Sequence, residues 1–145
     1  MFKRILLPTD GSETASHAVV AAISLAKELG AEVVGLTVIP RFHVFTYKSE
    51  MLEDTREEYA IDSQKRASEY LQYIADTARA EGVRCSVEYA VSDEPDEMIT
   101  SIALERGCDV IAIGSHGRRG IKGLLLGSVT QKVLVHSSVP VLVYR

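Results

Sequence analysis

The stretch that decides the fold is Asp109–His136, which reads DVIAIGSHGRRGIKGLLLGSVTQKVLVH. It begins with an apolar, β-branched run, Val110–Ile113, which is too short for a typical helix and is typical of a buried strand. A loop rich in glycine follows, and a short helical pattern begins near Ser128. Gln131 follows Ser128 at the spacing of a capping box, so we predict Ser128 as the cap of this helix.

The succession of strand, glycine loop and helix N-terminus has the chemistry of a phosphate site. Glycine can adopt positive φ and lets backbone N–H groups come close to a ligand. The first turn of a helix adds N–H groups without helical acceptors and the positive end of the helix dipole, which together suit phosphate oxygens. Arg118, Arg119 and Lys122 add positive charge to the same loop. These features alone leave an ordinary surface loop with tight turns as the alternative.

The spacing of the glycines resembles that of a known family. Gly114, Gly117 and the pair Gly127-Ser128 follow the pattern G-x2-G-x9-G-[ST], which is similar to that of the ATP-binding universal stress proteins. The stretch Ile5–Ser12 and the ending Val139–Val143 also resemble this family, so the likeness spans nearly the whole chain. The resemblance implies that these glycines and Ser128 hold the phosphates of ATP.

The same resemblance assigns further residues to the nucleotide. It implies that Pro8, Thr9 and Asp10 lie beside the adenosine, and that the backbone near Val38 reads the edge of adenine. The other candidates lie along the glycine loop or in the first turn of the helix after it: Ile113, His116, Arg118, Val129 and Thr130. No acidic residue lies near His116 in the sequence to orient it, so we do not predict that it acts as a general base.

Asp10 follows directly on a predicted buried strand and has two interpretations. As a structural residue it would cap the turn Asp10–Ser12. As a functional residue it would bond a ribose hydroxyl or help to hold a metal ion bound to phosphate, and its place at the end of a strand favours this. Thr9 likewise has a structural and a functional interpretation, because its side chain can point into the core.

Composition limits the class of protein. The chain has 145 residues, of which 46% are hydrophobic and 25% charged, and this predicts one soluble domain over residues 1–145. The net charge of −4 argues against nucleic-acid binding. No apolar run approaches the roughly 20 residues that span a bilayer. Cys85 and Cys108 lack metal-ligand spacing, and a cytoplasmic location is the default expectation.

The chain alternates between strand and helix patterns. Strands are predicted at 4–7, 32–39, 83–89, 110–113 and 140–144. Helices are predicted from the cap Ser12 to Gly30, from about Arg56 to Ala80, from 92–95 to Gly107, and from Val129 to about His136. The strand at 83–89 alternates apolar and polar residues, which predicts a sheet edge with one wet face. The segment 41–55 has no clean period and is predicted to be a partly ordered loop.

This alternation predicts an α/β fold, with an open parallel sheet of about five strands and helices on both faces. The family resemblance implies the strand order 3-2-1-4-5 of a Rossmann-like fold that binds adenine nucleotides. Ligands of such sheets bind beyond the carboxyl ends of the strands, where the order reverses. That point lies between the first and fourth strands, so Pro8–Asp10 and Ile113–Gly114 are expected to meet there.

Several enzyme motifs are absent from the sequence. There is no G-x4-G-K-[ST] of a P-loop NTPase, no G-x-G-x-x-G after the first strand and no G-x-S-x-G nucleophile elbow. Phosphoryl-transfer enzymes usually carry a group that positions the nucleophile and dedicated metal ligands, and Asp10 is the one plausible metal-side carboxylate here. We therefore expect binding with little catalysis; a slow ATPase or a nucleotidyl-transfer enzyme on the same fold is the alternative.

Our expectation is an ATP-binding regulator, with Mg²⁺ accompanying the nucleotide and an unidentified protein as its target. A nucleotide-free stress protein is a weaker possibility, because the glycine pattern is present. Pro140–Tyr144 is apolar on both sides and is expected at the other sheet edge. A bare edge invites pairing, and a two-fold antiparallel strand pair would cover it, which predicts a homodimer.

Overall fold

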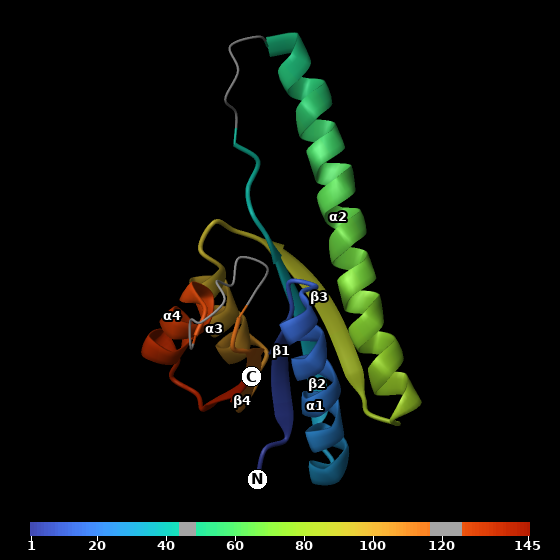
Figure 1. Cartoon of the computed structure of the whole chain (residues 1–145), viewed down its shortest axis with the longest axis vertical. Coiled ribbons are helices and arrows are strands. Elements are labelled where there is room, and N and C mark those ends of the chain that lie inside the picture. Colours follow the sequence, from blue (N-terminus) through green and yellow to red (C-terminus); the bar gives the residue numbers. More distant parts are fainter. Residues whose placement is uncertain (44–48, 117–125) are drawn as a thin grey trace.

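The computed structural model describes residues 1–43, 49–116 and 126–145, with the segment 49–54 described by its backbone alone. Five parallel strands form one sheet in the order β3-β2-β1-β4-β5, which confirms the predicted fold class and order. The strands are β1 Arg4–Pro8, β2 Glu32–Ile39, β3 Cys85–Val91, β4 Val110–Gly114 and β5 Val141–Tyr144. Figure 1 shows the whole chain.

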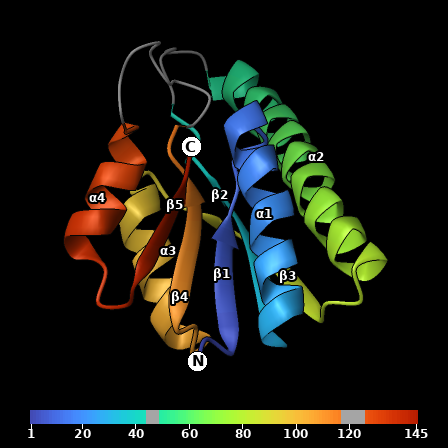
Figure 2. The ribbon, with the colours of Figure 1, turned by 60° about the horizontal axis from the view of Figure 1, so that its bottom comes forward.

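Helices cover both faces of the sheet. They are α1 Glu13–Leu29, α2 Ser49–Ala80, α3 Pro95–Glu105 and α4 Ser128–His136. Figure 2 shows α1 and α2 on one side and α3 and α4 on the other. The side chains of β1 divide between the two layers: Ile5 packs in the cluster with α1 and α2, and Leu6 packs in the cluster with α3 and α4. This alternation follows from the two-residue period of a strand that is buried on both faces.

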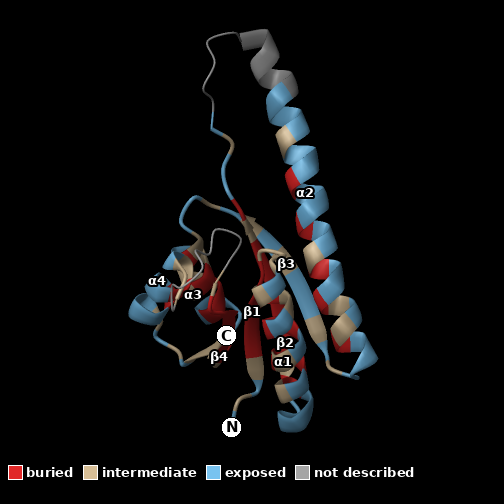
Figure 3. Cartoon of the chain, viewed as in Figure 1, coloured by how far each residue is buried: buried red, intermediate tan, exposed pale blue. Residues whose placement is uncertain are grey.

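Burial differs sharply between the centre and the edges of the sheet (Figure 3). All residues of β4 are buried, whereas every residue of β5 is half-buried. β3 lies at the opposite edge, as its alternating pattern predicted. Its apolar side chains are nevertheless 41% exposed at Val87, 45% at Tyr89 and 49% at Val91, because α2 covers this edge only in part.

The prediction for the segment before α2 was wrong in part. The helix begins at Ser49 instead of about Arg56, so 49–55 is helical where a loop was expected. With 32 residues, α2 is about 48 Å long, and its N-terminal part extends beyond the sheet (Figure 1). This part has no core to face, which explains why its sequence shows no clean apolar period. Residues 44–48 lie outside the described part of the chain.

Both ends of α1 and the start of α3 were predicted correctly. The Ser12 hydroxyl accepts a hydrogen bond from the Ala15 N–H at 3.1 Å, as an N-cap side chain does. Gly30 ends the helix with φ +66, the left-handed conformation that favours glycine. Pro95 lies in the first turn of α3, where a missing N–H is tolerated. These caps depend on local sequence, which is why they could be read from it.

Candidate functional site

The carboxyl ends of β1 and β4 lie side by side, as the topology predicted, and we call the region beyond these two strand ends the crevice. β1 pairs with β4 through Ile5 with Val110 and Leu6 with Ile111. Continued along the parallel strands, this register brings the turn after Pro8 beside the end of β4 at Gly114. Figure 2 shows both strands ending at the same edge of the sheet. Strand order reverses here, so this is the topological switch point.

The turn after β1 is held by hydrogen bonds within itself and to β2. The Thr9 N–H donates to the Leu36 carbonyl at 2.8 Å, and the Thr37 hydroxyl donates to the Thr9 carbonyl at 3.1 Å. The Thr9 hydroxyl accepts the Gly11 N–H at 3.1 Å, and Thr9 is only 9% exposed. The Thr9 side chain is therefore buried and shapes the turn, and its place beside the adenosine stays a prediction.

Asp10 is half-buried at the end of this turn. Its Oδ1 accepts the Ser12 N–H at 3.0 Å, so Asp10 caps the turn as its structural interpretation predicted. The carboxylate is thereby fixed at the edge of the crevice. Its role toward a ribose hydroxyl or a metal ion stays a prediction.

Two hydrogen bonds join the end of β4 to the start of α4. The Gly127 N–H donates to the Ser115 carbonyl at 2.6 Å, and the Thr130 hydroxyl donates to the Gly114 carbonyl at 2.8 Å. We call these four residues, Gly114, Ser115, Gly127 and Thr130, the neck. Ser115 is 1% exposed and Thr130 is 3% exposed, so both bonds lie in the interior. The neck brings the two ends of the glycine loop together.

The start of α4 corrects one prediction. The N-cap is Gly127, in an extended conformation with φ −71 and ψ 160, and Ser128 is the first helical residue. The Gly127 carbonyl already accepts the first helical bond, from the Gln131 N–H at 3.0 Å, so the helix starts one residue earlier than the sequence suggested. The Gln131 amide donates to the Leu126 carbonyl at 3.0 Å in place of a capping box.

The first turn of α4 supplies the predicted donors through its backbone. Because helical bonding begins at Gln131, the N–H groups of Ser128, Val129 and Thr130 have no acceptor within the helix. The Thr130 side chain is used by the neck, so this residue can offer a ligand its N–H only. The Gly127 N–H is likewise used by the neck.

Val38 presents backbone groups toward the same crevice. Pro8, the last residue of β1, lies opposite Leu36, so β1 ends before it reaches Val38. The Leu36 carbonyl bonds toward β1, and alternate residues of a parallel strand bond toward the same neighbour. The N–H and C=O of Val38 therefore point toward the β1 side beyond its end, while its side chain packs against the α3 and α4 cluster.

The remaining candidates divide between described and undescribed residues. Ile113 is buried at 7% exposure and serves as core. His116 is half-buried, with its Nδ1 2.9 Å from the Ser115 hydroxyl. Gly117 and Arg118 lie outside the described residues, as do Arg119 and Lys122. The charge that the loop brings to the site therefore stays a prediction.

The structure also shows contacts that the sequence analysis missed. A Cβ added to Gly114 would lie 3.3 Å from the Thr14 carbonyl oxygen, so glycine lets the first turn of α1 approach β4 closely. Gly11 has φ +75, and a Cβ there would lie 2.2 Å from Cε1 of Tyr70 on α2. The pattern Gly11-Ser12 at a strand-to-helix turn signals positive φ, but nothing local signals Tyr70.

Two cavities lie away from the crevice. One, of about 310 Å³, is bordered by Arg4, Arg84 and Arg106 at the opposite end of the strands. The other, of about 160 Å³, lies between Phe42 and the N-terminal part of α2. Within the described ranges, no three His, Cys, Asp or Glu residues are placed to hold a metal ion together. Among the same residues, no helix has the length and apolarity to cross a membrane.

Comparison with known proteins agrees with the family resemblance of the sequence. The model of the universal stress protein family matches residues 1–145. Universal stress protein YxiE of Bacillus subtilis is 34% identical over 149 residues, which cover 100% of both chains. Universal stress protein MJ0577 of Methanocaldococcus jannaschii is 31% identical over 156 residues, which cover 100% of this chain and 96% of that protein.

Solved structures share the fold. A structure of MJ0577 has a TM-score of 0.84 and 33% identity, over 99% of this chain and 96% of that one. A universal stress protein in complex with cAMP has a TM-score of 0.72 and 25% identity, over 99% and 97% of the two chains. With a family model that matches from the first residue to the last, and relatives alike over their full length, the chain belongs to the universal stress protein family.

Proposed function

We propose that this protein binds an adenine nucleotide, ATP, in the crevice between β1 and β4 and acts as a nucleotide-dependent regulator. The observation that carries the proposal is the neck, which joins the first turn of α4 to the end of β4, the strand next to β1. A helix N-terminus at a topological switch point suits a phosphate chain. The similar structure in complex with cAMP supports an adenine nucleotide as the ligand class.

Each part of the crevice has a separate task in this proposal. The N–H groups of Ser128, Val129 and Thr130 donate to phosphate oxygens, aided by the positive end of the α4 dipole. The N–H and C=O of Val38 pair with the edge of adenine, which carries both donors and acceptors. Asp10 accepts a ribose hydroxyl. Gly117 and Arg118 complete the phosphate site from the glycine loop.

Mg²⁺ would enter with the nucleotide. Protein-bound Mg²⁺ usually takes one or two carboxylates, with phosphates and water as its other ligands. The Asp10 carboxylate at the edge of the crevice fits this requirement, and no dedicated metal cage is needed. The metal would neutralise phosphate charge there.

A regulatory role suits this site better than rapid turnover. Fast phosphoryl transfer needs a group that positions the nucleophile. Asp10 is already engaged by the Ser12 N–H, and the His116 ring lies against the Ser115 hydroxyl, so both side chains have contacts that shape the site. ATP would then act by changing the surface that an unidentified protein partner meets. A cytoplasmic location is part of this proposal.

The structure allows a direct test of the backbone donors. Ser128→Pro removes one N–H at the first helical position, where proline is tolerated. The preceding Gly127 has the extended backbone that a following proline requires, so the helix should be retained. We expect ATP binding, measured by calorimetric titration, to weaken about tenfold, the equivalent of one charge-assisted hydrogen bond. The matched control Ser128→Ala keeps the N–H and should bind within about twofold of wild type.

A companion measurement identifies the nucleotide. The purified protein is denatured and its supernatant separated by chromatography, before and after long incubation with Mg-ATP. Bound ATP that persists would support a regulator, whereas conversion to ADP that is lost in Asp10→Asn would favour the slow ATPase. Protein that carries no nucleotide and takes up none in the titration would overturn the proposal.

We also propose a homodimer through β5. The Tyr144 carbonyl bonds to β4, so by alternation Val141 and Val143 direct their N–H and C=O groups to the open edge. An antiparallel pair around a two-fold axis would satisfy these groups. Val141→Lys should yield monomers in sedimentation velocity, while an intact dimer would exclude this interface.

A further inference from the structure

The turn that carries Asp10 is contacted from outside by a side chain of α2. The ring of Tyr70 lies against the Cα of Gly11, because a Cβ built there would be 2.2, 2.4 and 2.5 Å from three of its ring carbons. Gly11 also has φ +75. The neighbouring residues are tied by the bonds from Gly11 to the Thr9 hydroxyl and from Ser12 to Asp10. The ring thus adds a contact from α2 to a turn that is also held by its own hydrogen bonds and by those to β2.

A second glycine fixes the position of α2 one helical turn away. A Cβ on Gly35 in β2 would lie 3.0 Å from Cδ1 of Ile74 and 3.1 Å from Cγ1 of Val87. Ile74 is fully buried and follows Tyr70 by four residues, so both side chains lie on the inner side of α2. Side chains from successive turns of α2 therefore pack against Gly11 and Gly35. Close packing at both points leaves the Tyr70 ring little freedom to move.

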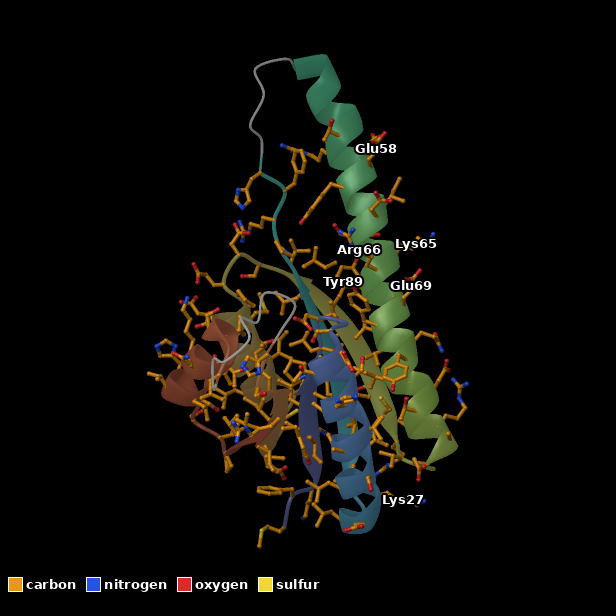
Figure 4. The ribbon with its side chains drawn as sticks, in the orientation of Figure 1. Lys27, Glu58, Lys65, Arg66, Glu69 and Tyr89 are labelled. Carbon is orange, nitrogen blue, oxygen red and sulfur yellow. The ribbon has the colours of Figure 1, made fainter. Side chains whose placement is uncertain are left out.

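Tyr70 is the residue through which α2 contacts the turn after β1. From Ser49 to Tyr70 the helix rises about 31 Å, and its N-terminal end extends beyond the sheet (Figure 1). Glu58, Lys65 and Glu69 are exposed there and point away from the rest of the chain (Figure 4). The buried side of α2 begins at Ser63 and Ala67, which are 5% and 1% exposed, and continues through Tyr70 to Ile74.

We infer that Tyr70 is a positioning residue for the nucleotide: its ring holds the Thr9–Ser12 turn in the geometry that presents Asp10 to the crevice. The inference rests on the proposed function. Without the ring, the glycine at position 11 regains its wide backbone freedom, and the turn must be ordered when the ligand binds. The reciprocal effect also holds, since a ligand that orders the turn stabilises the seating of α2 by the same free energy.

The experiment compares ATP affinities by calorimetric titration for full-length variants with matched melting curves. Tyr70→Ala should bind ATP about five- to twenty-fold more weakly, and Tyr70→Leu, which keeps bulk without the flat ring, should also weaken binding. Tyr70→Phe keeps the ring that contacts Gly11 and should bind ATP more tightly than both of these variants. The matched control is Tyr73→Ala, at a position on the same helix that is 44% exposed. This variant should leave the ATP affinity unchanged.

The outcomes separate this inference from the proposal on which it rests. If wild type binds ATP and both Tyr70→Ala and Tyr70→Leu bind within twofold of it, the positioning role is excluded and the ATP site stands. If wild type takes up no ATP, the proposed function fails first. If Tyr70→Ala does not fold, the ATP affinities of Tyr70→Leu and Tyr70→Phe are compared instead. Rescue by phenylalanine together with loss in leucine would assign the effect to the ring.

Discussion

The neck between β4 and α4 makes a quantitative prediction about stability. Thr130→Val keeps the volume of the side chain and removes its only hydrogen-bond donor. The Gly114 carbonyl then loses a 2.8 Å partner in the interior, where Thr130 is 3% exposed. A buried polar group left unpaired destabilises the folded state by about 1–3 kcal/mol. We expect the free energy of unfolding to fall by that amount, because water cannot reach the carbonyl without opening the neck.

Urea-induced unfolding followed by circular dichroism measures this change. The control is Thr100→Val in α3, whose hydroxyl donates at 3.1 Å to the Asp96 and Glu97 carbonyls of its own helix. Those carbonyls belong to helical turns, so the control should change stability by less than about 0.5 kcal/mol. Equal stability of Thr130→Val and Thr100→Val would refute the reasoning. The neck would then be held by the Gly127 bond and packing alone.

Three further predictions concern the fold. Ser12→Ala removes the cap of α1 and should lower the free energy of unfolding, measured by chemical denaturation, by about 1 kcal/mol. The control is Ser24→Ala, at an exposed position within the same helix, which should not lower it. Gly35→Ala should cost about 1–3 kcal/mol through its contact with Ile74, and Ile74→Val in the same chain should restore part of this loss. Burial raises the pKa of the Cys108 thiol from 9.0 to about 11. The thiol of the unfolded chain therefore ionises first, and the free energy of unfolding should fall as pH rises from 9 toward 11. Cys108→Val should lessen that fall, and a pH profile that Cys108→Val leaves unchanged would contradict this prediction.

Local patterns accounted for much of the fold. The strand 32–39 and the caps Ser12 and Gly30 were predicted as observed. Each rests on a short stretch: a run of β-branched residues, a hydroxyl before a helix, a glycine after one. The edge position of β3 was also predicted, but the expected division into a buried apolar face and a wet polar face was wrong, because Val87 and Tyr89 are 41% and 45% exposed. The strand order needed the family resemblance as well, since periodicity does not encode order.

Predictions failed where a distant part of the chain decides. The start of α4 shifted to a Gly127 cap, because the neck bonds of Gly127 and Thr130 set where the helix begins. The segment 49–55 is helical although its sequence has no apolar period, since it continues the half of α2 that packs on the sheet near Ile74. Helix propagation from a packed region needs no apolar face of its own.

The sequence by itself determined the element order and the class of sheet, and together with the family resemblance it indicated the stretches that meet at the switch point. These follow from periodicity and turn chemistry, which act over a few residues. Only the tertiary structure decided that Thr130 bonds to Gly114 and that Tyr70 rests on Gly11. Such pairs join positions far apart in the chain, and their formation depends on how helices seat on the sheet, where glycine permits an approach that no local pattern records.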